Sequence, residues 1–205
     1  MLFLITRPRY DLATHYLYYW SKALLAMATS KSIAFIDIKK EKVIKKSVLS
    51  YIKKKAPDVV ILNGHGSDNS VTGDGSKEIL SVSDDLSIFE GKKIYVRSCD
   101  SGKLLGPALV KNGAVGFIGY QESFVFPFQP ESIHDPITDD IAAICLLPSN
   151  QIAEALIKGA SVREAHEKGI KVSQEKLEKL QTSSSYDSRF APFLFWNMTN
   201  QVCYE

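Results

Sequence analysis

The sequence predicts an α/β protein in which a mostly parallel sheet lies between two layers of helices. Short apolar runs rich in β-branched residues recur at 2–5, 33–37, 58–62, 93–97 and 115–119. Such continuous runs are typical of strands that are covered on both faces. Segments with helical character stand between successive runs, and the connections are short. This alternation indicates a parallel sheet with helices on both faces, a three-layer α/β/α arrangement.

The elements of the first 121 residues follow from local patterns. After the strand at 2–5, we expect a helix at 11–27 with aromatic residues on one face, then a strand at 33–37 and a helix at 41–54. The strand at 58–62 precedes a Gly-, Asp- and Ser-rich stretch at 64–76, which predicts a long loop or a small hairpin. After the strand at 93–97, a helix at 103–111 ends at Asn112-Gly113, and a strand follows at 115–119.

The pattern changes after residue 121. Prolines interrupt the apolar segment 124–130, which predicts a loop or an edge segment near the site. Helices are expected at 138–146, 148–159 and 161–180, the last with Ser161 and Glu164 as a capping box. A Ser-rich loop at 182–188 and a last strand at 193–197 complete the chain. We therefore expect a single domain over 1–205, with its core in 1–121 and a helical and C-terminal strand extension in 122–205.

Composition favours a compact intracellular enzyme. The chain has 205 residues, of which 45% are hydrophobic and 23% charged, and a net charge of +2, so no nucleic-acid or membrane partner is implied. The lysine runs at 39–46 and 53–55 suit the solvated face of a helix. Three cysteines without metal-binding spacing favour a reducing compartment. The first apolar run is too short for a signal peptide, so we expect a cytoplasmic protein.

A histidine and a cysteine follow two of the predicted strands. His65 lies in Asn63-Gly64-His65-Gly66 after the strand at 58–62, and Cys99 follows the strand at 93–97. Because the carboxyl ends of parallel strands meet at one edge of a sheet, the two side chains should leave on the same edge. A cysteine nucleophile with a histidine acid or base needs this arrangement.

The surroundings of Cys99 suit acyl transfer. A thiol attacks as the thiolate, and the partial positive charge of a helix N-terminus stabilises that form. We expect such a helix to begin at about Gly102, with Ser101 as its N-cap, and Gly102 to let a substrate backbone approach closely. The backbone N–H groups of Gly66 and Cys99 are the candidate oxyanion donors.

Each of these residues also has a purely structural explanation. A cysteine after a buried strand is commonly a small core residue, and a histidine in a glycine-rich turn is often structural. The remaining cysteines and histidines are weaker candidates. Cys145 lies in an apolar helix, Cys203 has no histidine near it in the sequence, and His15, His134 and His166 are expected to be structural or solvated.

The three segments 63–66, 98–102 and 113–119 together resemble the caspase-like cysteine peptidases, the group that includes caspases, metacaspases, gingipains, clostripain, separase and CHAT domains. The resemblance covers residues 2–121. It implies a caspase-like fold, a His65/Cys99 dyad, an oxyanion hole formed by the N–H groups of Gly66 and Cys99, and hydrolysis of a peptide bond.

Arg97 and Asp100 are the candidate substrate-binding residues. In the resembled family, the residue two before the nucleophile faces the pocket for the side chain ahead of the cut bond. A guanidinium there would bind a carboxylate, which predicts cleavage after Asp or Glu. Alternatively, Arg97 pairs internally with Asp100, Glu122 or Asp37, and an acidic group such as Asp100 would then select a basic residue.

The sequence therefore predicts a cysteine endopeptidase that needs no metal or organic cofactor and acts on a protein or peptide. Three alternatives remain open: a catalytically inactive interaction module with the same fold, a peptidase that cleaves after basic residues, and another acyl-transfer enzyme acting on thioesters or amides. The sequence also leaves open whether the chain forms a homodimer through its last strand.

Overall fold

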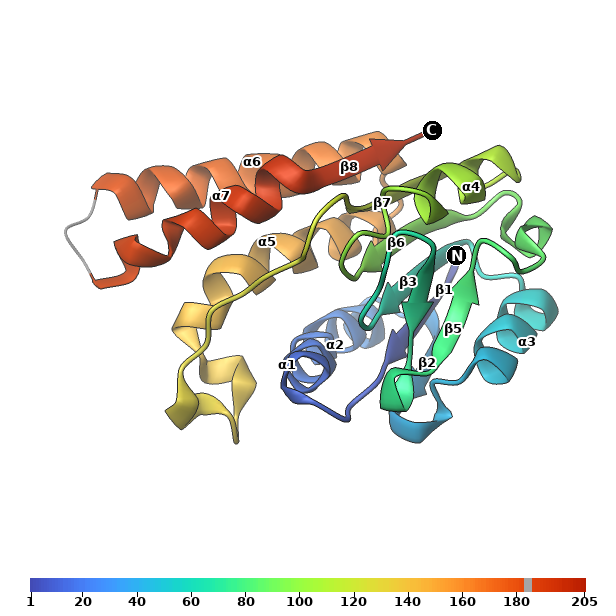
Figure 1. Cartoon of the computed structure of the whole chain (residues 1–205), viewed down its shortest axis with the longest axis horizontal. Coiled ribbons are helices and arrows are strands. Elements are labelled where there is room, and N and C mark those ends of the chain that lie inside the picture. The colour runs from blue at the N-terminus through green and yellow to red at the C-terminus, as the bar shows by residue number, and fades with distance from the viewer. Residues whose placement is uncertain (183–185) are drawn as a thin grey trace.

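The computed structural model describes residues 1–182 and 186–205, and within these it contains a six-stranded sheet of order β2-β1-β3-β6-β7-β8 (Figure 1). Its strands are β1 Leu2–Arg7, β2 Ala34–Lys39, β3 Val59–Asn63, β6 Lys93–Arg97, β7 Gly116–Tyr120 and β8 Gln201–Tyr204. The first five run parallel, and β8 pairs antiparallel with β7. The predicted α/β fold with a mostly parallel sheet is confirmed.

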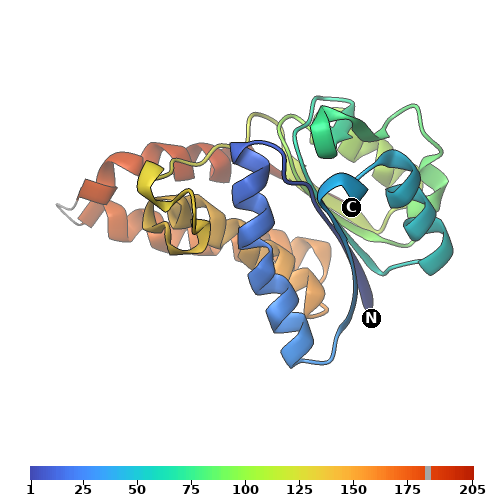
Figure 2. The ribbon, with the colours of Figure 1, turned by 90° about the horizontal axis from the view of Figure 1, so that it is seen from below.

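Helices cover both faces of this sheet (Figure 2). The α-helices are α1 Leu12–Trp20, α2 Lys22–Ser30, α3 Lys45–Lys55, α4 Leu105–Lys111, α5 Asp140–Ile157, α6 Val162–Thr182 and α7 Ala191–Asn200. Short 3₁₀ turns lie at Lys40–Lys42, Asp74–Ser76, Leu86–Phe89, Pro130–Ser132, Pro136–Thr138 and Tyr186–Phe190. A hairpin of β4 Ser70–Thr72 and β5 Glu78–Ser81 forms a second, two-stranded sheet, one of the two possibilities that the sequence predicts for this region.

Alternation along the strands divides the core into two layers. On β3, Val59 and Ile61 pack with residues of α2, α5 and α6, whereas Val60 and Leu62 pack with residues of α3 and α4. Successive side chains of a strand point to opposite faces, so a strand buried on both sides must be apolar throughout. This requirement explains why these strands can be read from the sequence as uninterrupted apolar runs.

One helix, α5 Asp140–Ile157, stands where helices are predicted at 138–146 and 148–159, so the prediction of two helices is wrong. Pro148 lies inside α5 as one of its buried residues. A proline inside a helix removes one backbone hydrogen bond, a cost that tertiary packing has to offset. By length and composition alone α5 could cross a membrane, yet 67% of that stretch is buried, as in the core helix of a globular domain.

The predicted strand at 193–197 is also wrong, because these residues belong to α7. Leu194 and Asn197, three positions apart, are buried, while Phe193, Phe195 and Trp196 are exposed. A short apolar run fits either a strand or one face of a helix, and here the helical spacing prevails. The last strand is β8, and of the Ser-rich loop predicted at 182–188, residues 183–185 lie outside the described part of the chain.

Candidate active site

His65 and Cys99 follow neighbouring strands in register. The ladder of β3 and β6 pairs Asn63 with Arg97, and His65 and Cys99 each come two residues later. The amide of Gly64 donates to the carbonyl of Arg97 at 3.4 Å, which carries the contact between the two chains past the strands. The structure therefore places both residues at the same edge of the sheet.

Glycine allows the two turns to touch. A Cβ atom added to Gly66 would lie 2.6 Å from the Ser98 hydroxyl and 2.7 Å from the Cys99 carbonyl oxygen, closer than any side chain permits. On its other side the histidine turn contacts β4, where the Thr72 amide donates to the His65 carbonyl at 2.8 Å. The backbone before and after His65 is thus held against β6 and β4.

The His65 imidazole has a carboxylate partner that the sequence analysis missed. Its Nε2 lies 2.5 Å from Oδ2 of Asp11, the N-cap of α1. A carboxylate accepts hydrogen bonds, so Nε2 carries the proton and Nδ1 is the nitrogen available for a reacting group. The Tyr10 ring approaches the imidazole edge-on, with 6.1 Å between the ring centroids.

Asp11 is itself held in place by a capping box. Its Oδ1 accepts from the Thr14 amide at 2.9 Å and from the Thr14 hydroxyl at 2.7 Å. Burial alone would raise the pKa of Asp11, but the hydrogen bonds from Thr14 and His65 outweigh burial and lower the pKa below its ordinary value. A carboxylate that stays ionised and fixed can orient the His65 ring and stabilise an imidazolium.

Cys99 is a half-buried free cysteine in a turn that precedes α4 by several residues. The N-cap of α4 is Leu104, so the predictions that Ser101 caps the helix and that Cys99 sits at its N-terminus are wrong. Gly102 does not face the site either: it is buried, its amide donates to the Tyr120 carbonyl at 2.8 Å, and an added Cβ would meet Val202. This glycine anchors the turn to the end of β7 instead of admitting a substrate.

The two predicted oxyanion donors have no partner among the residues that the structure describes. No carbonyl or side chain of residues 1–182 and 186–205 accepts a hydrogen bond from the amide of Gly66 or of Cys99. The neighbouring amides are engaged, since Ser67 donates to the Ser70 carbonyl and Asp100 donates to the Glu122 carbonyl. Two unpaired amides on touching turns are what a developing oxyanion requires.

Arg97 lies beneath the site and not in it. Its guanidinium is fully buried. Nε donates to Asn63 Oδ1 and Nη2 donates to Ser21 Oγ, each at 2.7 Å. Nη1 donates to Asn150 Oδ1 at 2.7 Å and, more weakly, to Ser149 Oγ at 3.4 Å. We call these five side chains the Arg97 network. Burial lowers the pKa of Arg97, and the electrostatic effects of Tyr95 and Tyr120 offset this lowering only in part.

This placement favours the prediction that Arg97 is bound internally, with neutral side chains and not acidic ones as its partners, and argues against a role in substrate binding. A guanidinium without exposed surface offers no donor to a substrate carboxylate. The acidic groups proposed as internal partners are also engaged elsewhere: Asp37 binds Arg7 at 2.6 Å, whereas Asp100 and Glu122 lie 2.6 and 3.5 Å from Lys103. Asp100 is at the rim of the Cys99 turn, and its carboxylate is occupied by Lys103.

The remaining candidates behave as expected of structural residues. Cys145 is 2% exposed in α5, and burial raises the pKa of its thiol to about 12. Cys203 is half-buried in β8, and burial likewise raises its pKa. His15 bonds to Arg9 and to the Ile133 carbonyl, and His166 bonds to Gln201. Of the three thiols, that of Cys99 belongs to a turn that touches the turn of His65, a histidine with a carboxylate partner.

Comparison with solved structures agrees with this architecture. No protein-family model matches the chain, and neither does any curated protein. The fold resembles the crystal structure of the Arg-specific cysteine proteinase gingipain R, with a TM-score of 0.59, 11% identity, and coverage of 98% of this chain and 45% of that one. It also resembles the complex of Porphyromonas gingivalis RgpB pro- and mature domains, with a TM-score of 0.59, 10% identity, and coverage of 98% and 46%. This chain thus spans less than half the length of those proteins, and it has the gingipain-like, caspase-like fold that the sequence motifs predict.

Proposed function

We propose that this protein is a cysteine endopeptidase in which Cys99 is the nucleophile and His65 the acid and base. The observation that carries the proposal is the hydrogen bond between His65 Nε2 and Asp11 Oδ2, in a turn that touches the turn of a free cysteine. A histidine bonded on one nitrogen by a fixed carboxylate, beside a thiol and two unpaired amides, forms the minimal set for acyl transfer. The likeness to a gingipain fold is consistent with this chemistry.

The reaction proceeds in two steps, formation of a thioester on the enzyme and its hydrolysis. The Cys99 thiol passes its proton to His65 Nδ1. The resulting thiolate forms a C–S bond to the peptide carbonyl carbon, whose oxygen becomes an oxyanion bound by the amides of Gly66 and Cys99. As the C–N bond breaks, His65 Nδ1 gives its proton to the leaving amine, and a thioester remains on the enzyme. A water molecule then attacks the thioester, His65 takes one proton from it, and the C–S bond breaks to release the acid and restore the thiol–imidazole pair.

Asp11 serves as a positioning residue in this scheme. Its bond to Nε2 fixes the ring and stabilises the imidazolium that stands ready to protonate the amine. The preference for an acidic residue before the cut bond loses its basis, because Arg97 is buried. A preference for a basic residue stays an alternative, and a fluorogenic peptide library varied at that position decides it.

Selective alkylation tests the assignment. We expect iodoacetamide or a peptide acyloxymethyl ketone to modify Cys99 of the native protein at least tenfold faster than Cys145 or Cys203, both of which carry raised pKa values. Cys99→Ala should abolish turnover of the library. His65→Ala should lower turnover by about 10² to 10⁴-fold. Both changes should alter the free energy of unfolding by less than about 0.5 kcal/mol.

The inactive interaction module predicts a different result. In that case Cys99 and Cys203 react at similar rates, and no peptide of the library is cleaved. Turnover of thioesters or simple amides without cleavage of any peptide would instead favour another acyl-transfer enzyme, because the same groups serve that chemistry.

A further inference from the structure

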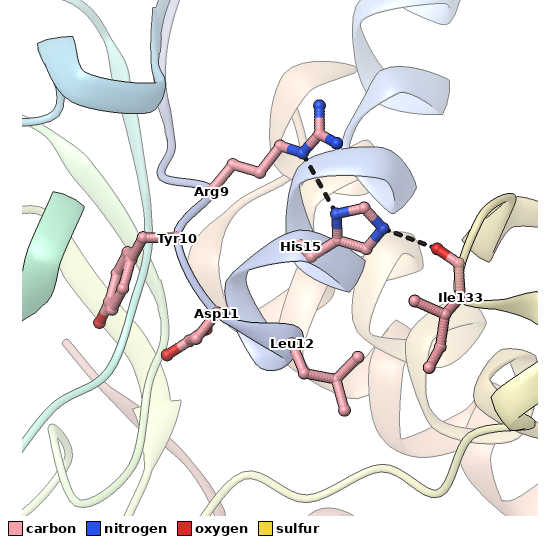
Figure 3. A pocket seen from close by; sticks show the side chains of 6 residues that line it. All are labelled: Arg9, Tyr10, Asp11, Leu12, His15 and Ile133. Carbon is pink, nitrogen blue, oxygen red and sulfur yellow. Dashed lines mark hydrogen bonds between the residues drawn. The ribbon is translucent and has the colours of Figure 1, made fainter.

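A cavity of about 340 Å³ adjoins the candidate active site and has no role in the scheme above (Figure 3). It is lined by Arg9, Tyr10, Asp11, Leu12, His15 and Ile133. Asp11 belongs to both places: it borders the cavity, and its Oδ2 lies 2.5 Å from His65 Nε2. Whatever occupies this cavity therefore lies within reach of a substrate held at the dyad.

Arg9 supplies the cavity with an uncompensated positive charge. Its Nε donates to His15 Nδ1 at 3.2 Å, and no described residue accepts a hydrogen bond from its two terminal nitrogens. No carboxylate of residues 1–182 and 186–205 lies within ion-pair distance of it. The four terminal N–H groups form the planar fork that binds a carboxylate bidentately.

The hydrogen bonds of His15 leave this histidine uncharged in the structure. Arg9 Nε is a donor, so His15 Nδ1 accepts, and the Ile133 carbonyl is an acceptor 2.8 Å away, so His15 Nε2 carries the proton. His15 thus fixes the guanidinium of Arg9 without competing for its terminal donors. In Figure 3 this chain of contacts spans the cavity from Arg9 to Ile133.

A second cation, Lys22, shares an aromatic ring with Arg9, and no carboxylate of residues 1–182 and 186–205 lies within ion-pair distance of it. Lys22 Nζ is 4.1 Å from the centroid of the Tyr19 ring, and the guanidinium carbon of Arg9 is 5.2 Å from the same centroid. The contrast is Arg7, whose guanidinium also stacks on a tyrosine of this helix but is neutralised by Asp37 at 2.8 and 2.6 Å. Two like charges on one aromatic ring repel each other, and a bound anion would relieve that repulsion.

We infer that this cavity is a subsite for an acidic side chain of the peptide substrate, with Arg9 as its specificity-determining residue and Lys22 as a supporting charge. The Asp11 carboxylate that borders the cavity is already engaged by Thr14 and His65, which limits its repulsion of an incoming acid. The inference rests on the proposed function for the identity of the ligand as a substrate.

The position of the subsite follows from the imidazole. Asp11 binds His65 through Nε2, whereas Nδ1 is the nitrogen that reacts, so the cavity lies behind the ring relative to the cut bond. An extended chain advances about 3.3 Å per residue. We therefore assign the subsite to a residue at least two positions from the cut bond, which distinguishes it from the role predicted for Arg97.

Binding and turnover test this assignment separately. The binding probe is a fluorescein-labelled decapeptide of Gly and Ser that carries two Glu, compared by anisotropy with its Gln twin on the Cys99→Ala protein. We expect the Glu peptide to bind at least tenfold more tightly, Arg9→Met to bring the ratio to about one, and Lys22→Met to lower it by about threefold. The matched control is Lys31→Met, which removes an exposed lysine at the end of α2 and should leave the ratio unchanged.

The turnover probe is the fluorogenic library, with Glu against Gln at each position from two to four residues on either side of the cut bond. A preference for Glu at one position, expressed in KM and abolished by Arg9→Met, supports the subsite. A preference that survives Arg9→Met, or that Lys31→Met abolishes equally, overturns it. Acid binding that depends on Arg9, without cleavage of any peptide, would refute the peptidase while supporting an acid-binding site.

Discussion

The two arginines near the active-site edge, Arg97 and Arg9, occupy opposite environments. Arg97 is fully buried in the Arg97 network, where four side-chain oxygens accept from its three nitrogens. Arg9 is exposed at the rim of a cavity and has His15 as its hydrogen-bond partner. The first charge is used to hold segments of the chain together, and the second remains available to a ligand.

The same contrast between buried and available groups separates two layers of residues, one at the ends of β3 and β6 and one in the turns that follow them. Asn63 and Arg97, one layer below, are joined to each other and to Ser21 and Asn150 by buried hydrogen bonds. His65 and Cys99 follow two residues later, with a partly exposed imidazole and a half-buried thiol. A closed polar layer directly beneath an open one provides a rigid support for reactive groups, as functional sites require. Substitutions below should therefore change stability, and substitutions above should change activity.

The largest expected effect on stability is that of Arg97→Met. The change leaves the amide oxygens of Asn63 and Asn150 buried without their donors, and each such loss costs about 1–3 kcal/mol. We expect the free energy of unfolding in urea to fall by about 3 kcal/mol. The matched control is Arg9→Met, an exposed change that should stay within about 0.5 kcal/mol of the parent protein.

The opposite order of stabilities would contradict the contrast between a structural Arg97 and an available Arg9. If Arg97→Met were as stable as the parent while Arg9→Met unfolded readily, the buried network would not support the strand ends. Relief from the desolvation of a buried charge opposes the expected loss, so a gain in stability would mean that desolvation exceeds the worth of all four hydrogen bonds.

The sequence predicts the strands that support the site better than it predicts the surroundings of their charged residues. Strand β6 is predicted at its observed bounds, because an apolar strand covered on both faces has few alternatives. The burial of Arg97 was also within reach: it lies two residues after Tyr95, hence on the same face, and the Tyr95 side chain packs on the α2 and α5 side of the sheet. The family resemblance predicts that the Arg97 side chain faces a substrate pocket, whereas the alternation of side chains along the strand predicts that it lies under α5.

Contacts between distant segments could not be predicted in this way. Asp11 has a recognisable capping pattern with Thr14, but the sequence contains no signal for its bond to His65, 54 residues away. The start of α4 was misplaced because Ser101 resembles an N-cap, while the structure closes a turn on Tyr120 before the helix begins. Both errors come from tertiary contacts that override local patterns.

A smaller effect on stability is expected at Cys145. Cys145→Ser places a hydroxyl in an apolar cluster of α5, α6 and α7, where the thiol is 2% exposed and Asn197 is its polar neighbour. We expect a loss of about 1–3 kcal/mol, measured by urea unfolding, with unchanged turnover. Cys99→Ser is the matched control in the open layer, and it should lose turnover while keeping its stability. Equal losses of stability in the two variants would contradict the expectation that substitutions in the open layer change activity and not stability.

The smallest expected effect on stability concerns Asp11, whose carboxylate links the open layer to the cavity. The folded pKa of Asp11 lies below its ordinary value, so the unfolded chain binds more protons in this range, and Asp11 adds stability that is present above about pH 4 and lost as the pH falls through the folded pKa. Asn caps a helix about as well as Asp, so Asp11→Asn keeps the bond to Thr14. It removes the charge and also turns an amide donor toward His65 Nε2, which disfavours the tautomer that carries its proton on Nε2. Urea unfolding should therefore find the variant slightly less stable at pH 7 and equal to the parent near pH 2.

At pH 7 turnover should fall about 10- to 100-fold, the worth of one charged hydrogen bond to the imidazolium. A variant that loses turnover without any change in the pH dependence of stability would mean that Asp11 acts on His65 during the reaction alone, and equal turnover in both proteins would remove Asp11 from the mechanism.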